Sequence, residues 1–125
     1  MNAGEFLLLV VAGGVGATVR YVVDALIRSR TTSAFPWPTA VINLTGSLLL
    51  GLLTGLVADR IASDELSAVL GTGFLGGYTT FSTASYETVQ LVRERHWGTA
   101  LAYGVGILVA SVALAYLGYR WGDSA

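Results

Sequence analysis

The chain has 125 residues, of which 54% are hydrophobic and only 12% charged, with a formal net charge of -1. A soluble domain carries about 25% charged residues, so half of the usual charge is missing. The length allows one domain. The near-neutral charge, without any polybasic stretch, argues against a nucleic-acid partner, and the absence of cysteine excludes disulfides and thiolate metal sites.

The first span is the least regular, because Arg20 and Asp24 interrupt an apolar segment that begins at Phe6. We interpret it as a spanning helix and not as a signal peptide, since the five residues before it carry no positive charge. Later in the chain, residues 31–58, 66–86 and 97–119 contain no Asp, Glu, Lys, Arg or His. A membrane-spanning helix needs about 20 apolar residues. We therefore predict an all-α integral membrane protein whose single domain, residues 1–125, has four spans at about residues 5–27, 37–58, 65–92 and 97–121.

The ends of these spans carry suitable signals. Pro36 suits the start of the second helix, and Ser63 or Asp64 is expected to cap the third. Tryptophans favour the headgroup level of a membrane, and all three fall at predicted span ends, namely Trp37, Trp97 and Trp121.

Positive charge gives the chain only a weak orientation. Four arginines (Arg28, Arg30, Arg93 and Arg95) lie on one side of the predicted spans and two (Arg60 and Arg120) on the other. So small a bias under the positive-inside rule permits insertion in both directions. Four short helices are also too thin a bundle to enclose a wide pore, so we expect an oligomer, with a dimer as the simplest closed form.

Glycine accounts for 16 residues, most of them inside the predicted helices. Small residues let helix backbones approach closely in lipid. Gly51 and Gly55 form a G-x-x-x-G pair on the second span, and Gly73 and Gly77 form another on the third. For most of these glycines, tight helix packing is a sufficient explanation.

The polar segment of residues 76–83, Gly-Gly-Tyr-Thr-Thr-Phe-Ser-Thr, lies in the middle of the third span. Adjacent glycines and threonines are poor helix formers, and we predict a helix break at midmembrane. Irregular backbone is tolerated there only when it is buried in protein or lines a wet cavity. Freed carbonyls suit a hard monovalent cation, whereas hydroxyl and N–H donors suit an anion. A simple packing kink is the alternative.

Other polar residues inside the spans are functional candidates, because such groups are costly in a membrane. Asn43 can line a pore or form a hydrogen bond between helices. Arg20 can extend to the interface or pair with Asp24 one turn later, which favours a structural or vestibule role. Glu87 lies seven residues after Thr80 on the same helical face and is expected in a vestibule.

Two polar residues of the fourth span, Tyr103 and Ser111, share one helical face at a spacing of eight residues. Ile107 interrupts the stripe between them. The only histidine, His96, lies in a polar connection, where a solvated residue is expected.

These residues resemble the motifs of the small fluoride channels of the Fluc/CrcB type, and the resemblance covers nearly the whole chain. Residues 13–21 are similar to the first-helix signature of that family, and residues 35–39 and 43–46 with Gly51 to its second. Residues 73–83 are similar to the third and most specific signature.

The resemblance implies a passive fluoride-selective channel in the cell membrane, which exports fluoride to relieve toxicity. It implies an antiparallel, dual-topology homodimer with two pores. A structural sodium ion would lie at the dimer centre, bound by the carbonyls of Gly76 and Thr79. The fluoride pathway implied by the family comprises Asn43, Thr80, Phe81, Thr83, Tyr103 and Ser111.

The chain departs from the family pattern at two positions that bear on the pathway. Ala84 stands where a second phenylalanine is usual, and Ile107 replaces a hydroxyl residue. Because ring edges carry positive quadrupole charge, losing one ring is expected to weaken anion coordination. One hypothesis is a heterodimer in which another family member supplies the missing ring.

Two other functions are alternatives. A small proton-coupled exporter needs a titratable carboxylate deep in its first helix, whereas Glu5 lies at the edge and the midpoint is Gly14 and Val15. A non-conducting membrane assembly subunit is the second alternative, which Ala84 and Ile107 leave open. No enzyme is expected, since no nucleophile–base pair or metal cluster is evident.

Overall fold

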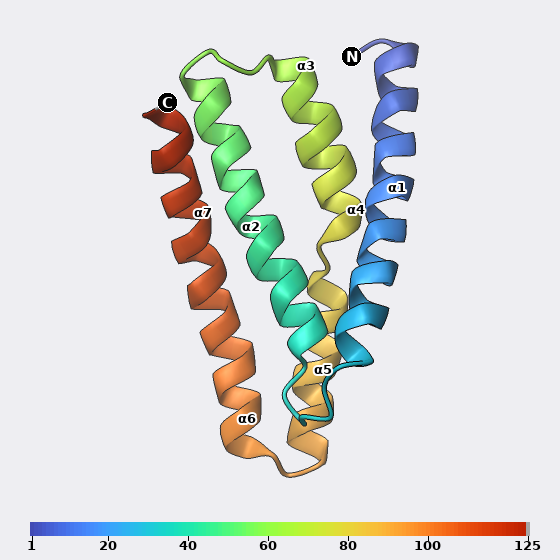
Figure 1. Cartoon of the computed structure of the whole chain (residues 1–125), viewed down its shortest axis with the longest axis vertical. Coiled ribbons are helices and arrows are strands. Elements are labelled where there is room, and N and C mark those ends of the chain that lie inside the picture. The colour runs from blue at the N-terminus through green and yellow to red at the C-terminus, as the bar shows by residue number, and fades with distance from the viewer. Residues whose placement is uncertain (125) are drawn as a thin grey trace.

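A computed structural model describes residues 1–124, all of whose regular elements are helical. Two long helices are followed by two composite helical columns (Figure 1). The long helices are α1 (Ala3–Arg28) and α2 (Trp37–Ala58). The third column consists of α3 (Asp64–Ser67), the π-helical η1 (Ala68–Leu75), α4 (Gly76–Tyr78) and α5 (Phe81–Arg93). The fourth column consists of α6 (Trp97–Leu101), the π-helical η2 (Ala102–Gly106) and α7 (Ile107–Asp123).

Three helices are long and apolar enough to cross a membrane: Ala3–Arg28, Trp37–Ala58 and Trp97–Asp123. Large apolar side chains on their outer faces are open, as at Leu8, which is 59% exposed, and Val109, which is 61% exposed. A lipid environment covers such surface without the cost that water would impose. The chain is therefore a multi-pass membrane protein, and the predicted all-α class is confirmed.

Short polar motifs begin and end the helices. Ser63 caps the third column, because its hydroxyl accepts the Leu66 N–H at 3.1 Å. Arg60 follows α2 and Arg95 follows α5, each in the left-handed conformation (φ 60° and 62°). The N–H groups of the next residues, Ile61 and His96, donate to carbonyls of the preceding helix, as in a Schellman motif.

Both chain ends lie near the α2–α3 loop, at the end of the molecule opposite the α5–α6 loop (Figure 1).

Glycines bring α2 and α7 into backbone contact. A Cβ on Gly51 would collide with the Ala115 carbonyl, and one on Gly55 with the Tyr119 carbonyl. Gly118 and Gly122 on α7 face the α2 backbone just as tightly. The close packing predicted for the Gly51 and Gly55 pair is confirmed, whereas its partners on α7 were not singled out from the sequence.

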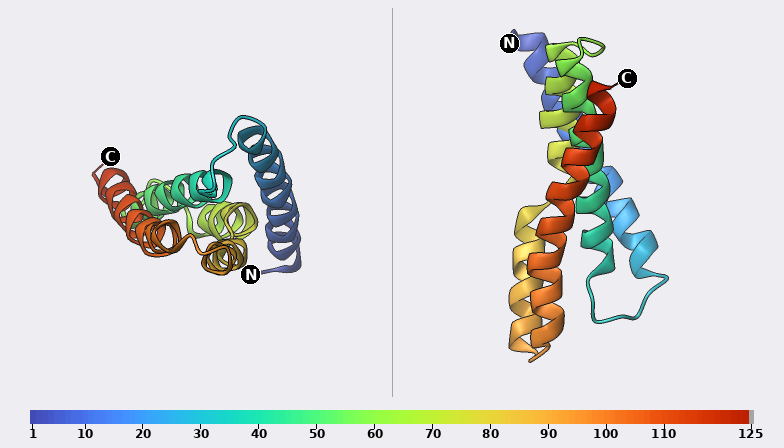
Figure 2. Two further views of the ribbon diagram at one scale, coloured as in Figure 1. Left: turned by 90° about the horizontal axis from the view of Figure 1, so that it is seen from below. Right: turned by 90° about the vertical axis from the view of Figure 1, so that its left-hand side faces the viewer.

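The third column changes neighbours at its middle. Before the middle, η1 and α4 pack against α1, again through glycines: a Cβ on Gly16 would meet the Phe74 carbonyl, and one on Gly77 the Gly13 carbonyl. After the middle, α5 leaves α1 and packs against α6 and η2 (Figure 2). The half of the column before the middle therefore lies away from α7. The site described below lies where the column separates from α7.

We predict that Gly51→Ala lowers the stability of the purified protein by about 1–3 kcal/mol, the usual cost of overpacking, because α2 and α7 must separate. Gly14→Ala is the matched control, since a Cβ there meets nothing within 4 Å. Thermal unfolding in detergent measures both. Equal unfolding temperatures for the two variants would contradict the packing argument.

Candidate functional site

The third column is interrupted between Tyr78 and Phe81. Thr79 (φ -81°, ψ 161°) and Thr80 (φ -149°, ψ 120°) are extended. The interruption falls near the middle of residues 64–93, where the composition of residues 76–83 predicted a break. Extended backbone cannot continue the i to i-4 hydrogen bonds of a helix, so each freed group needs another partner.

Asn43 of α2 forms hydrogen bonds with the interruption from one side. Its amide nitrogen donates to the Thr80 carbonyl at 2.8 Å, and its amide oxygen accepts the Thr80 N–H at 2.9 Å. One side chain thus satisfies both backbone groups of an extended residue. Of the two roles considered for Asn43, the hydrogen bond between helices is present, and the residue also lines the groove described below.

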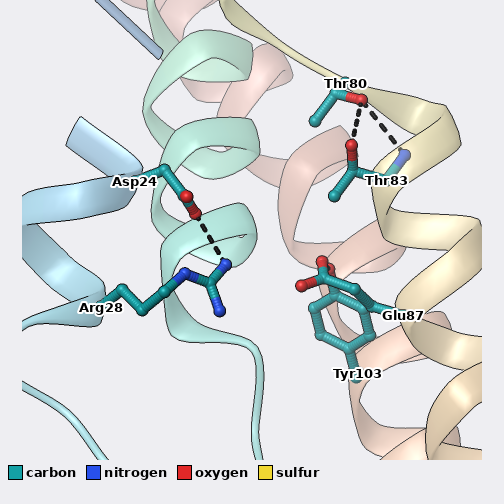
Figure 3. Close-up of polar contacts among 6 residues, drawn as sticks. All are labelled: Asp24, Arg28, Thr80, Thr83, Glu87 and Tyr103. Atoms are coloured by element: carbon teal, nitrogen blue, oxygen red, sulfur yellow. Dashed lines mark hydrogen bonds and ion pairs between the residues drawn. The ribbon is translucent and has the colours of Figure 1, made fainter. Parts of the chain in front are cut away.

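Thr80 and Thr83 together begin the second half of the column. The Thr80 hydroxyl caps α5 by accepting the Thr83 N–H at 3.2 Å, and it donates to the Thr83 hydroxyl at 3.0 Å (Figure 3). This is the usual N-cap arrangement. The Thr80 O–H is therefore used within the protein, whereas Thr83 accepts this bond and keeps its own O–H as a donor.

Arg20 of α1 reaches the interruption from the other side. Its Nε donates to the Gly77 carbonyl at 3.2 Å. The pairing of Arg20 with Asp24 considered from the sequence is wrong, because Asp24 accepts from Arg28 at 3.0 Å instead (Figure 3). Helical spacing allows either partner for Asp24, and only the tertiary structure brings Gly77 within reach of Arg20.

Four consecutive carbonyls at the interruption, from Gly76 to Thr79, lose their helical donors, and the first and last of them belong to residues that line the groove. The Thr80 N–H, which would bond the Gly76 carbonyl in a continuous helix, bonds Asn43. The Thr83 N–H, which would bond the Thr79 carbonyl, bonds the Thr80 hydroxyl. Gly76 and Thr79 both line the groove. Their carbonyl oxygens are the type of ligand that replaces the hydration shell of a monovalent cation, so this pair fits the sodium ion that the resemblance implies.

A groove of about 630 Å³ lies between α2, the interrupted column and the fourth column. It is lined by all the predicted pathway residues except Thr83, namely Asn43, Thr80, Phe81, Tyr103 and Ser111. The Phe81 ring, 83% exposed, borders it openly.

Three further groove residues were missed from the sequence. Ser47, Ser85 and Thr88 also line the groove. A signal was available, because Ser47 follows Asn43 by four residues and Ser85 follows Phe81 by four, which places each pair on one helix face. The Thr88 hydroxyl bonds the Ala84 carbonyl at 2.8 Å.

Tyr103 and Glu87 separate the groove from a second cavity. The Tyr103 side chain is 1% exposed, and its hydroxyl donates to Glu87 Oε1 at 3.0 Å (Figure 3). Glu87 lines a cavity of about 280 Å³ beside the α1–α2 loop, together with Phe35. The carboxylate is therefore kept out of the groove. Since its one O–H is committed to Glu87, Tyr103 presents only its ring to the groove.

Comparison with known proteins identifies the family. Residues 7–119 match the family described as CrcB-like protein, Camphor Resistance (CrcB). The chain belongs to this family. A relative from Leifsonia xyli, named fluoride-specific ion channel FluC 1, is 48% identical over 95% of this chain and 87% of its own length.

Two other relatives of this CrcB-family chain bear the same kind of name. A fluoride-specific ion channel FluC of Thermus thermophilus is 41% identical over 96% of each chain. Fluoride-specific ion channel FluC 1 of Streptomyces avermitilis is 45% identical over 89% of this chain and 90% of its own length. The family resemblance inferred from residues 13–21, 43–46 and 73–83 is confirmed.

We predict that Asn43→Ala destabilises the protein by about 1–3 kcal/mol, the cost of leaving a partly buried backbone group unpaired. Hydrogen exchange at the Thr80 amide should also quicken. Ser47→Ala, one turn further on the same helix and the same groove, serves as the control. Denaturant unfolding and hydrogen exchange of the purified protein measure both effects. An unchanged exchange rate at the Thr80 amide would show that the Asn43 hydrogen bonds do not stabilise the interruption.

Proposed function

We propose that this protein is a passive, fluoride-selective ion channel, in which the interrupted third column forms a fourth membrane span. The observation that carries the proposal is the interruption at Thr79 and Thr80 beside a groove lined with polar side chains. The names of the relatives from Leifsonia, Thermus and Streptomyces support fluoride as the ion.

The free hydrogen-bond donors of the groove suit a small anion. Within residues 1–124, the hydroxyls of Ser47, Ser85 and Ser111 have no protein partner, whereas those of Thr80 and Thr88 are engaged. A fluoride ion that sheds tightly held water needs such donors in its place. The serine hydroxyls, with the remaining N–H of the Asn43 amide, would supply them. No carboxylate lines the groove as the structure describes it, so no negatively charged side chain there repels an anion.

A second subunit would complete the groove. The side chain of Phe81 lies open at its edge, and the freed carbonyls that each chain presents on groove-lining residues are those of Gly76 and Thr79. A two-fold axis would bring four carbonyls together. The weak arginine bias allows the two copies to insert antiparallel, as a dual-topology homodimer. A sodium ion held by these carbonyls would supply a fixed positive charge between the two pathways.

Passive conduction is sufficient for export of this ion. Neutral HF crosses a bilayer and dissociates inside the cell, which traps fluoride. An inside-negative potential of 100 mV drives an anion outward by about 2.3 kcal/mol, a bias of roughly fiftyfold. A selective pore therefore removes fluoride without an energy source and relieves its toxicity.

The deciding experiment is ion efflux from liposomes that contain the purified protein. We expect fluoride to leave rapidly and chloride to remain. Asn43→Ala should reduce fluoride efflux at least tenfold while the dimer persists in gel filtration. Chloride efflux as fast as fluoride efflux would refute the selectivity. A folded dimer that passes neither ion would favour the non-conducting assembly subunit.

Ala84 allows a test of the aromatic contribution. Ala84 lines the groove and packs against the buried cluster that includes Tyr103, so a ring there would border the pathway. If the ring edge stabilises the anion by about 0.5–1.5 kcal/mol, as aromatic pairs do, Ala84→Phe should raise fluoride efflux roughly two- to tenfold. Ala84→Leu controls for side-chain volume. Unaltered efflux in Ala84→Phe would show that the missing ring is irrelevant and would remove the main reason to expect a heterodimer.

A further inference from the structure

We infer that Arg20 is a positioning residue: its hydrogen bond to the Gly77 carbonyl fixes the backbone that presents the Gly76 and Thr79 carbonyls to the central cation. Its Nε–H would replace the helical N–H that the interruption removes. The inference rests on the proposed function, because it concerns the ligands of the proposed sodium site. It assigns Arg20 a role defined by a hydrogen bond, distinct from a role in attracting the anion by charge.

The hydrogen bonds around the interruption support this role. In a continuous helix the Gly77 carbonyl would accept the Phe81 N–H, four residues later. The extended residues Thr79 and Thr80 intervene, and Arg20 Nε lies 3.2 Å from the Gly77 oxygen instead. Of the four consecutive carbonyls disturbed by the interruption, from Gly76 to Thr79, Gly77 is thus the one supplied with a side-chain donor from another helix.

The packing of α1 brings Arg20 to this carbonyl. Gly13 lies against Gly77, and Gly16 lies against the Phe74 carbonyl, so that α1 contacts η1 and α4 without intervening side chains. Arg20 follows Gly13 by seven residues and therefore faces the same way. A bulkier α1 face would hold Nε too far from the Gly77 oxygen for a hydrogen bond.

The position of Arg20 separates a positioning role from direct ion contact. The groove is lined by Gly76 and Thr79 but not by Gly77 or Arg20. The guanidinium therefore acts from the α1 side, behind the interruption. Asp24, its neighbour one turn later, is paired with Arg28 and does not compete for the guanidinium.

Three variants of Arg20 distinguish the hydrogen bond from the charge. Arg20→Gln places an amide nitrogen at the same number of bonds from Cβ as Nε, but without charge. Arg20→Met places a methyl group there and removes the donor. Arg20→Lys keeps the charge and moves the donor one bond further out. The readout is the sodium concentration that gives half of the maximal thermal stabilisation of the purified dimer, with potassium as the control cation.

We expect the sodium concentration for half-maximal stabilisation of Arg20→Gln to stay within about threefold of that of the natural protein. Arg20→Met should require a sodium concentration higher by about three- to twentyfold, the range given by measured hydrogen bonds between membrane helices. Equal shifts in Gln and Met, with recovery in Lys, would overturn the inference in favour of charge. No shift in any variant would overturn it as well.

Two further readouts keep the test decisive. If the natural protein shows no stabilisation specific to sodium, the sodium site itself is refuted and the inference falls with it, while fluoride efflux still tests the channel separately. If Arg20→Met does not fold, the ¹³C chemical shift of the Gly77 carbonyl is compared between the natural protein and Arg20→Gln. A shift retained in Gln supports the inference, and loss of the hydrogen-bonded value overturns it.

Discussion

A polypeptide inside a membrane must satisfy every backbone polar group within the protein, and the interruption of the third column depends on this constraint. Side chains from three elements meet it: Asn43 from α2 pairs with both groups of Thr80, Arg20 from α1 takes the Gly77 carbonyl, and Thr80 caps α5. Among the carbonyls left without a donor, those of Gly76 and Thr79 belong to residues that line the groove, whereas Tyr78 does not line it. The local structure thus contains backbone groups that are hydrogen-bonded within the protein and carbonyls that remain available to an ion.

Glycine packing makes this arrangement possible, because the Asn43 side chain is short and the Arg20 Nε has a fixed reach, so neither can form its hydrogen bond across a wide gap. Gly46 of α2 is buried against Thr79 and Tyr78, where a Cβ would collide with the Thr79 methyl group. Asn43, one turn earlier, can therefore reach the Thr80 backbone. On the opposite side, the contact of Gly13 with Gly77 sets the reach of Arg20 in the same way. The hydrogen bonds of the polar site therefore depend on the close packing of the helices in this protein.

The sequence predicted features whose cause is local. Adjacent glycines and threonines indicated the break, and Ser63 was foreseen as a cap. Partners distant in the chain were beyond such reasoning: Arg20 was compared only with Asp24, since helical spacing says nothing of Gly77, 57 residues away. The resemblance placed the hydroxyls of Thr80 and Thr83 on the pathway, and a sequence does not reveal that the Thr80 O–H donates to Thr83, which leaves the Thr83 O–H as the remaining donor of the pair. Ser47 and Ser85 were overlooked, although their i+4 spacing from Asn43 and Phe81 made them detectable.

The distribution of donors in the groove follows from the same requirement that polar groups find partners within the protein. A threonine hydroxyl near a helix start or on a helix is easily consumed by nearby backbone, as at Thr80, which caps α5, and Thr88, which bonds the Ala84 carbonyl. The serines of the groove have no such partner within residues 1–124, and the Tyr103 hydroxyl donates to Glu87. In the proposed channel, unoccupied serine donors would therefore stabilise the anion, while the unpaired carbonyls would hold the cation. Opposite charges could then be accommodated on neighbouring parts of one groove without any ionised side chain lining it.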